Sequence, residues 1–310
     1  MRYAPLSCYN ITRIRLSPAQ FVHAANHKTR FPFFPALPRL GLTVFLVAAR
    51  RPRIGSRCIF VAYGGLGHGV VVSVMTTPVI EFDQVSLGWG GRVAVRDVSG
   101  SFKQGSLTAV VGPNGAGKST LVKGIAGLIS PLRGHIRLGS GARIACLPQL
   151  SELDRSFPVT VYDLVAMGSW PRVGSWRRFG RSEHDSIQQA LNTVGLADFA
   201  QRIIGTLSGG QLQRALFARL MLHDADTLVL DEPFAAVDRA TTDDLVAIIS
   251  NWHREGRTVI AVLHDLELVR SHFPQALLLA GQAVAWGPTP DVLTTENMHL
   301  ARHLCAGDFL

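Results

Sequence analysis

The sequence predicts an α/β protein with a parallel core sheet, and three short apolar runs support this prediction. Residues 106–111 form the first run, which leads through a glycine-rich turn into a helical run at residues 121–126. Residues 227–231 and 258–265 have the same form, because each is an apolar run that ends in polar side chains. In an open parallel sheet, ligands bind at the edge where the strands end. We therefore expect these polar residues to form a site.

The glycine-rich turn after the first run fills the phosphate-binding pattern G-x-x-x-x-G-K-[ST] at every constrained position. Gly112, Gly115 and Gly117 allow the backbone to fold around an anion, with its N–H groups and the following helix N-terminus directed at phosphate oxygens. The pattern places Lys118 at the β- and γ-phosphates of ATP and the hydroxyl of Ser119 at the accompanying Mg²⁺. The remaining predicted nucleotide-binding residues of the loop are Pro113, Asn114, Ala116 and Thr120.

Composition indicates a globular protein of one large domain or two small ones, with 310 residues of which 47% are hydrophobic and 17% charged. The net charge of +9 is local. Residues 1–74 contain ten Lys or Arg and no acid, whereas the other 236 residues contain 21 Lys or Arg against 22 acids. A nucleic-acid partner is therefore not expected for the body of the protein. The four cysteines show neither paired nor metal-binding spacing, which favours a reducing compartment.

Residues 1–74 are expected to be a basic, unstructured extension. They contain six prolines and show no sustained period of 2 or 3.6 residues. The apolar run at residues 40–49 is too short to span a bilayer, and glycines interrupt the longer run at residues 58–74. Clear strand alternation begins at Val79, so we expect Met75 to be the natural start and the extension to be dispensable.

Two strands are expected before the phosphate loop, at residues 79–85 and 93–102, and they predict a small antiparallel sheet. Trp89 lies between them in a glycine-rich stretch that reads as a loop. A flat aromatic ring there suits stacking on adenine. A core residue at the sheet edge fits the spacing equally well, so the sequence leaves both interpretations open.

The second and third apolar runs supply the candidate catalytic residues. Asp231 and Glu232 end the second run, where Asp231 would hold the Mg²⁺ shell and Glu232 would orient or deprotonate the attacking water. The alternative interpretation makes Glu232 a surface salt-bridge partner. His264 ends the third run, where it would either contact the γ-phosphate or be purely structural.

A further stretch, Leu-Ser-Gly-Gly-Gln at residues 207–211, precedes a helical run and alone would be a simple helix cap. Together with the phosphate loop and Asp231-Glu232 it is highly specific, and residues 78–300 resemble the ATP-binding subunits of ABC transporters. In that family this motif is the signature, which completes the ATP site of the opposite subunit in a head-to-tail dimer. The signature residues predicted to bind nucleotide are Ser208, Gly209, Gly210 and Gln211.

The resemblance also assigns roles to individual residues. Trp89 matches the adenine-stacking aromatic, and Gln149 matches the catalytic Q-loop glutamine, which also ligates Mg²⁺. Asp238 matches the D-loop aspartate beside the nucleotide. Glu232 matches the general base and His264 the switch histidine.

The resemblance implies an ATPase with a P-loop NTPase (RecA-like) core, in which residues 75–310 form the ATP-binding domain. It implies a parallel sheet, an antiparallel β-subdomain and a helical subdomain inserted at about residues 150–215. Within that subdomain, residues 183–199 read as a helix. The expected partners are a second ATPase subunit, as a homodimer or a paired subunit, and a separate membrane permease. Such a subunit acts at the cytoplasmic face of the membrane.

Residues 154–168 and 231–238 are similar to importers of zinc, manganese and related metals, in which an extracytoplasmic metal-binding protein delivers the ion. Ferric-siderophore importers share much of this layout, so they remain an alternative. A different class, the soluble ABC ATPases that act on nucleic acid or ribosomes, is disfavoured by the neutral body and by the absence of a second cassette or coiled-coil insertion.

Overall fold

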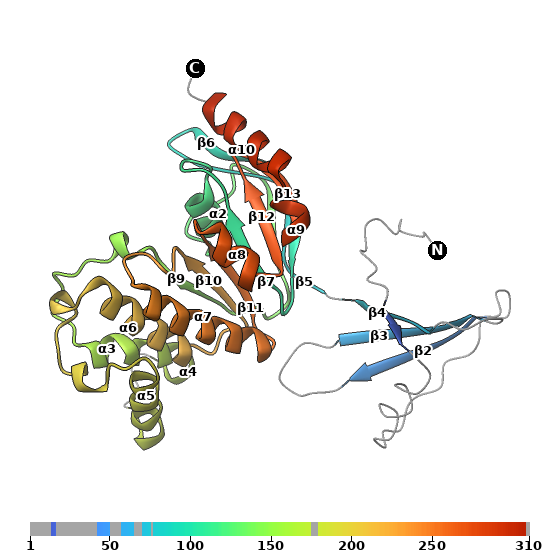
Figure 1. Cartoon of the computed structure of the whole chain (residues 1–310). Coiled ribbons are helices and arrows are strands. Elements are labelled where there is room, and N and C mark those ends of the chain that lie inside the picture. Colours follow the sequence, from blue (N-terminus) through green and yellow to red (C-terminus); the bar gives the residue numbers. More distant parts are fainter. Residues whose placement is uncertain are drawn as a thin grey trace. The chain divides into compact units, whose positions relative to one another are not determined.

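The computed structural model describes residues 14–16, 42–49, 57–64, 70–75, 77–174 and 179–307. The chain divides into two compact units, residues 1–77 and residues 78–310 (Figure 1). Among the described residues, no helix is both long enough and apolar enough to cross a membrane.

The first unit contains a four-stranded antiparallel sheet with strand order β1-β4-β3-β2. Its strands are β1 (Ile14–Leu16), β2 (Leu42–Ala49), β3 (Arg57–Gly64) and β4 (Val70–Met75). These strands differ from the expectation of an extension without regular structure. The physical reason lies in the distribution of residue types, because the six prolines fall outside the strands while β-branched and aromatic residues concentrate within them.

The second unit is built on a six-stranded sheet with order β13-β12-β7-β11-β10-β9. All pairs are parallel except the edge pair of β12 with β13. The strands are β7 (Leu107–Val111), β9 (Ile144–Leu147), β10 (Thr227–Asp231), β11 (Thr258–Val262), β12 (Gln275–Leu279) and β13 (Ala283–Pro288). The three apolar runs of the sequence are β7, β10 and β11, so the predicted parallel core is confirmed.

The core sheet is covered on both faces, which is why β7, β10 and β11 are buried at all five of their positions. Successive side chains point to opposite faces, so Val110 packs in one core and Ala109 and Val111 in the other. One core includes helix α2 (Lys118–Ile125) and the antiparallel sheet. The other includes helices α6 (Gly209–Leu222), α7 (Arg239–Arg254) and α8 (Leu266–His272).

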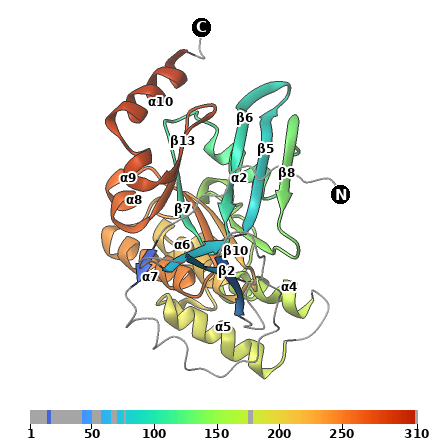
Figure 2. The same cartoon turned by 90° about the vertical axis from the view of Figure 1, so that its right-hand side faces the viewer.

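The antiparallel sheet has order β6-β5-β8, and Figure 2 shows its strands side by side. Its members are β5 (Pro78–Trp89), β6 (Arg92–Lys103) and β8 (Arg133–Leu138). Gly90 and Gly91, both with positive φ, form the tight turn between β5 and β6. The expected position of Trp89 on a loop is therefore wrong, because the hairpin closes in two residues and Trp89 is the last residue of β5.

Short helices connect β9 to β10 and form the expected helical part. They are α3 (Val161–Ala166), α4 (Trp170–Val173), α5 (Arg181–Thr193) and α6, joined by 3-10 turns at Leu150–Glu152, Met167–Ser169, Ala197–Phe199 and Ile204–Thr206. The helix predicted for residues 183–199 ends earlier, at Thr193, because Gly195 adopts a left-handed φ of 66°. After β13 come the helices α9 (Thr289–Val292) and α10 (Thr295–Gly307).

Candidate nucleotide site

The phosphate loop joins β7 to α2, in the strand–loop–helix order that the sequence predicts. Two of its glycines have no room for a side chain. A Cβ at Gly112 would lie 2.0 Å from the carbonyl oxygen of Leu279, and one at Gly117 would lie 2.4 Å from Cγ2 of Val95. Gly115 faces open space but has a φ of 81°. The loop conformation therefore requires glycine for two reasons, close packing and left-handed backbone.

The turn between β12 and β13 holds the phosphate loop from behind. The backbone N–H of Gly281 donates to the carbonyl oxygen of Ala116 at 3.0 Å, and the carbonyl of Gly281 accepts from the backbone N–H of Arg96 at 2.7 Å. The loop is thereby bonded to the β12–β13 turn, which lies more than a hundred residues later in the sequence. That turn is bonded in the same way to β6, which lies about twenty residues before the loop. These hydrogen bonds help to fix the shape of the loop.

Lys118 is almost fully buried in the loop, with 6% of its surface exposed. Its Nζ donates to the carbonyl oxygens of Gly112 at 2.9 Å and Pro113 at 2.8 Å. Burial lowers the pKa of Lys118, while the nearby negative charges of Glu232 and Asp231 act in the opposite direction. These two hydrogen bonds hold the ammonium against the backbone of the loop, where it can bind a phosphate.

Asp231 is buried at the end of β10, and its Oδ1 has no hydrogen-bond partner among the residues that the structure describes. Burial is the main reason that the pKa of Asp231 is raised, and the hydrogen bond with the Ser119 side chain opposes that effect. An orphaned carboxylate oxygen beside a hydroxyl is a donor set that suits a hard oxygen-binding cation. The residues present therefore fit Mg²⁺.

Glu232 follows Asp231 in a left-handed conformation, with a φ of 49°. Its Oε2 accepts a hydrogen bond from Nε2 of Gln149 at 2.8 Å, and its Oε1 lies 2.8 Å from Nε2 of His264. Partial burial alone would raise the pKa of Glu232, but the hydrogen bonds from His264 and Gln149 together with nearby positive charge lower it. Gln149 and His264, which follow β9 and β11, thus converge on the carboxylate of Glu232 after β10, as expected for that edge of the sheet.

Trp89 is 55% exposed at the tip of the β5–β6 hairpin. This exposure excludes the interpretation of Trp89 as a core residue at the sheet edge. The Nζ of Lys123, on α2, lies 5.8 Å from the centroid of the Trp89 ring. An exposed aromatic ring beside the phosphate-loop helix remains available for stacking on a flat base.

The signature stretch caps its own helix. The Oγ of Ser208 accepts from the backbone N–H of Gln211 at 3.2 Å, and Oε1 of Gln211 accepts from the N–H of Ser208 at 3.0 Å, which forms a capping box at the start of α6. A Cβ at Gly209 would lie 3.1 Å from Cβ of Ala236, so this helix end packs against the segment that leads to Asp238. Asp238 in turn caps α7 by accepting from Thr241 N–H at 2.8 Å.

The structure thus gathers the predicted residues into two groups. The first, which we call the phosphate half-site, contains residues 112–120, Gln149, Asp231, Glu232 and His264, with Trp89 nearby. The second, which we call the signature half-site, contains residues 208–211 and Asp238. Within residues 77–174 and 179–307, no hydrogen bond joins residues 208–211 to residues 112–120.

Sequence reasoning missed several residues that support these groups. Gln213 is fully buried, and its Nε2 donates to the carbonyl of Pro233 at 2.7 Å, which fixes the segment after Glu232. Lys123 lies one helical turn after Ser119, a spacing that places both on one helix face and that was visible in the sequence. Its ion-pair partner Glu152 had no such local signal, because 29 residues separate the two.

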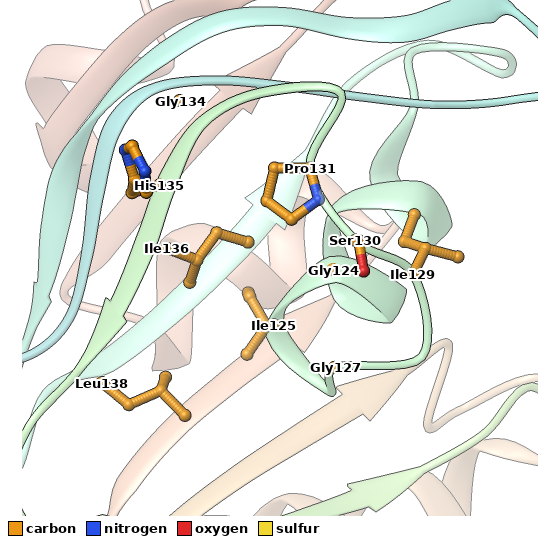
Figure 3. A pocket seen from close by; sticks show the side chains of 10 residues that line it. All are labelled: Gly124, Ile125, Gly127, Ile129, Ser130, Pro131, Gly134, His135, Ile136 and Leu138. Carbon is orange, nitrogen blue, oxygen red and sulfur yellow. The ribbon is translucent and has the colours of Figure 1, made fainter.

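Cavities on this unit lie both next to the predicted site and away from it. A cavity of about 450 Å³ between the end of α2 and β8 is lined by mainly apolar residues, among them Ile125, Ile129 and Ile136 (Figure 3). It contains none of the predicted site residues. A second cavity of about 440 Å³ is lined by Gln149, Arg155 and Ala235 among others, so it adjoins the phosphate half-site.

A phosphate loop, two carboxylates at the end of another parallel strand of the same sheet and a doubly covered sheet define a P-loop ATPase. Comparisons with known proteins identify the family. The ABC transporter family model matches residues 95–235. The manganese transport system ATP-binding protein MntB of Listeria innocua is 38% identical over 223 residues, which cover 70% of this chain and 93% of that protein. The zinc transport system ATP-binding protein TroB of Treponema pallidum is 37% identical over 232 residues, covering 73% and 87%. The chain belongs to the ATP-binding proteins of ABC transporters, which are ATPases.

Solved structures agree with this assignment. A transporter classed as metal-chelate type, in an inward-facing conformation, is 26% identical, with a TM-score of 0.65 over 73% of this chain and 90% of that chain. An ATP-binding cassette in its ADP conformation has a TM-score of 0.62 at 21% identity, and the match covers 74% of this chain and 99% of that chain. A bacterial cassette solved as a dimer has a TM-score of 0.60 at 24% identity, and the match covers 68% of this chain and 98% of that chain. The last two show the shared fold.

Proposed function

We propose that this chain hydrolyses ATP to power the import of a metal ion, zinc or manganese, through a separate membrane permease. The convergence of Gln149, Glu232 and His264 beside the phosphate loop carries the hydrolytic part of this proposal, with both bonds to Glu232 at 2.8 Å. The choice of metal is supported by relatives named as manganese and zinc transport proteins.

In this proposal ATP is the substrate, and its parts meet separate groups of residues. The backbone of residues 112–120 and the Lys118 ammonium bind the phosphates, while the exposed ring of Trp89 stacks on adenine. Ser119, Asp231 and Gln149 would hold Mg²⁺, which when bound neutralises charge on the phosphates. The partnerless Oδ1 of Asp231 supports this assignment.

Glu232 acts as the base that takes a proton from the attacking water. The hydrogen bonds from His264 and Gln149 lower the pKa of Glu232 and so favour its ionised form. Gln149 and His264 fix its orientation, yet each carboxylate oxygen retains a lone pair that can accept from water. Phosphoryl transfer depends mainly on positioning and charge stabilisation, so an oriented carboxylate is the contribution that this site can make.

A second subunit completes the site in this proposal. Ser208, Gly209, Gly210 and Gln211, with Asp238, form a helix N-terminus and its neighbouring cap, a place where backbone N–H groups favour an anion. Ser208 and Asp238 are exposed. In the part of the chain that the structure describes, no hydrogen bond ties residues 208–211 to the phosphate loop, and in this proposal they bind the phosphates of a partner subunit. The dimeric cassette among the solved structures supports this arrangement.

The pair of subunits would act at the cytoplasmic face of the membrane, bound to the permease, with an extracytoplasmic protein delivering the metal. ATP would draw the two subunits together, and hydrolysis would release them. Movement of the helices between β9 and β10 would transmit this cycle to the permease.

The decisive experiment is transport by the reconstituted assembly in proteoliposomes, using the permease that co-purifies with this chain. We expect ATP-dependent uptake of Mn²⁺ or Zn²⁺, lost in a Lys118→Ala variant. The alternative substrate is a ferric siderophore, which the metal-chelate type transporter favours as a candidate. Uptake of a ferric chelate without uptake of either divalent ion would replace the proposed substrate.

A further inference from the structure

One lysine outside the motifs lies between the Trp89 ring and the segment that follows Gln149. Lys123 lies on α2, one turn beyond Ser119, and its side chain is 27% exposed. Its Nζ lies 5.8 Å from the centre of the Trp89 ring and 2.6 Å from Oε1 of Glu152. A single ammonium is therefore shared between the exposed aromatic ring and a carboxylate on another segment.

Glu152 belongs to the same short turn as Gln149. The backbone N–H of Glu152 donates to the carbonyl oxygen of Gln149 at 3.0 Å, and the 3-10 turn Leu150–Glu152 starts directly after Gln149. The side chain of Gln149 in turn donates to Glu232. A continuous series of contacts thus runs from the Trp89 ring through Lys123 and Glu152 to the carboxylate at the phosphate end.

The Trp89 ring needs such support because of its position. It ends β5 beside a two-glycine turn, and more than half of its surface is exposed. A ring that must stack on a base binds more tightly when its orientation is fixed in advance, because less freedom is lost on binding. A cation over one face of an indole is attracted by the ring and leaves the other face free.

We propose that Lys123 is a positioning residue for the base-binding ring of Trp89, and that Glu152 holds the Lys123 ammonium in place. This inference rests on the proposed role of Trp89 in stacking on adenine. Lysine has a long, flexible side chain, so the ion pair supplies the restraint that the cation–π contact alone lacks. The base of the nucleotide is then recognised by a ring whose orientation depends on the Gln149 segment.

The test must separate the positioning of Trp89 from a direct electrostatic effect on phosphate binding, because the charges of Lys123 and Glu152 also act on Asp231. Burial is the main reason that the pKa of Asp231 is raised, and Glu152 adds to this rise while Lys123 reduces it. We therefore use the dissociation constant of inorganic tripolyphosphate divided by that of ATP. This ratio cancels such an effect to first order, because both ligands carry the phosphate chain. Only ATP carries the base.

We would measure this ratio by calorimetry, with tripolyphosphate in displacement of ATP, for Lys123→Met, Glu152→Gln and the double variant. The double variant is informative because it keeps the net charge of the pair. Lys123→Arg is the conservative variant, since arginine also stacks on rings and pairs with carboxylates. Lys103→Met, at the exposed end of β6, is the matched control.

We expect Lys123→Met to lower the ratio about two- to fivefold, the size of an exposed cation–π contact or ion pair. Glu152→Gln should lower it less, and the double variant should equal Lys123→Met, because Glu152 acts through Lys123. Lys123→Arg and Lys103→Met should keep the wild-type ratio.

A wild-type or higher ratio in Lys123→Met would overturn the inference, and a higher one would mean that the ammonium covers the face the base needs. Trp89→Ala distinguishes this from a failure of the proposed function. If Trp89→Ala collapses the ratio while Lys123→Met does not, the stacking role stands and only the positioning role fails. If Trp89→Ala leaves the ratio unchanged, the stacking role itself is wrong.

Discussion

The phosphate half-site and the signature half-site differ in how their polar groups are satisfied. In the phosphate half-site, groups from distant segments meet one another, as when Gln149 and His264 converge on Glu232. In the signature half-site, Ser208 bonds to Gln211 three residues away, and Asp238 to Thr241. The first is built by tertiary contacts and the second by local helix caps. One folded chain therefore forms both half-sites. In the proposed mechanism, a second copy of the chain is needed to bring a phosphate half-site and a signature half-site together.

The largest expected effect tests the phosphate half-site. Glu232→Gln should reduce kcat by about 10²–10⁴-fold while ATP binding is retained, because glutamine keeps the shape of the side chain but cannot accept the proton. Steady-state turnover and ATP calorimetry measure the two parts. Glu296→Gln, on α10, is the control and should behave as wild type. Weakened ATP binding with normal turnover of bound ATP would show that Glu232 is structural.

The next prediction tests whether the two half-sites belong to different subunits. Ser208→Arg and Lys118→Ala should each bring hydrolysis close to zero, the first by blocking the partner's phosphate and the second by loss of ATP binding. Mixed in equal amounts, they should recover at most about a quarter of wild-type activity, because half of the dimers then have one intact site of two.

The control mixture is Lys118→Ala with Glu232→Gln. Both changes lie in the phosphate half-site, so no subunit pairing restores an intact site and no activity should return. Recovery in this control, or none in the test mixture, would contradict a head-to-tail dimer.

A smaller effect tests how rigidly the phosphate loop is built. Gly115→Ala should lower the free energy of unfolding by about 1–2 kcal/mol, the cost of a left-handed backbone without a clash. Gly112→Ala should cost more, because its Cβ would also lie 2.0 Å from the carbonyl oxygen of Leu279.

Urea unfolding without nucleotide measures both losses. Gly141→Ala is the matched control, because Gly141 has a φ of 75° and a Cβ there would meet no described atom within 4 Å apart from its own residue and chain neighbours. Equal losses at Gly112 and Gly141 would mean that the β12–β13 turn yields and does not brace the loop.

The smallest expected effect concerns the first unit of the chain. We predict that removal of residues 1–74 leaves ATP affinity and turnover unchanged, because residues 78–310 contain every predicted site residue and form a compact unit of their own. Calorimetry and turnover of the truncated chain test this. A truncated chain that fails to fold, or that no longer joins the permease, would show that the extension is required.

The sequence alone determined the parallel core, the phosphate loop and the family, because these depend on local patterns. Apolar runs of five or six residues identify buried strands, and the constrained glycines identify an anion-binding turn. The same local rules failed at Trp89, which a two-residue turn makes part of a strand, and at residues 194–199, where Gly195 ends the helix.

Only the tertiary structure decided which distant groups touch. Glu232 receives bonds from residues 83 positions earlier and 32 positions later, and Lys123 finds Glu152 across 29 positions. No sequence period encodes such contacts, because they arise where parallel strands end at a common edge and where neighbouring loops fold against it. The chemical character of each residue can therefore be predicted from the sequence, whereas the residue that it contacts is set by the order of strands in the sheet.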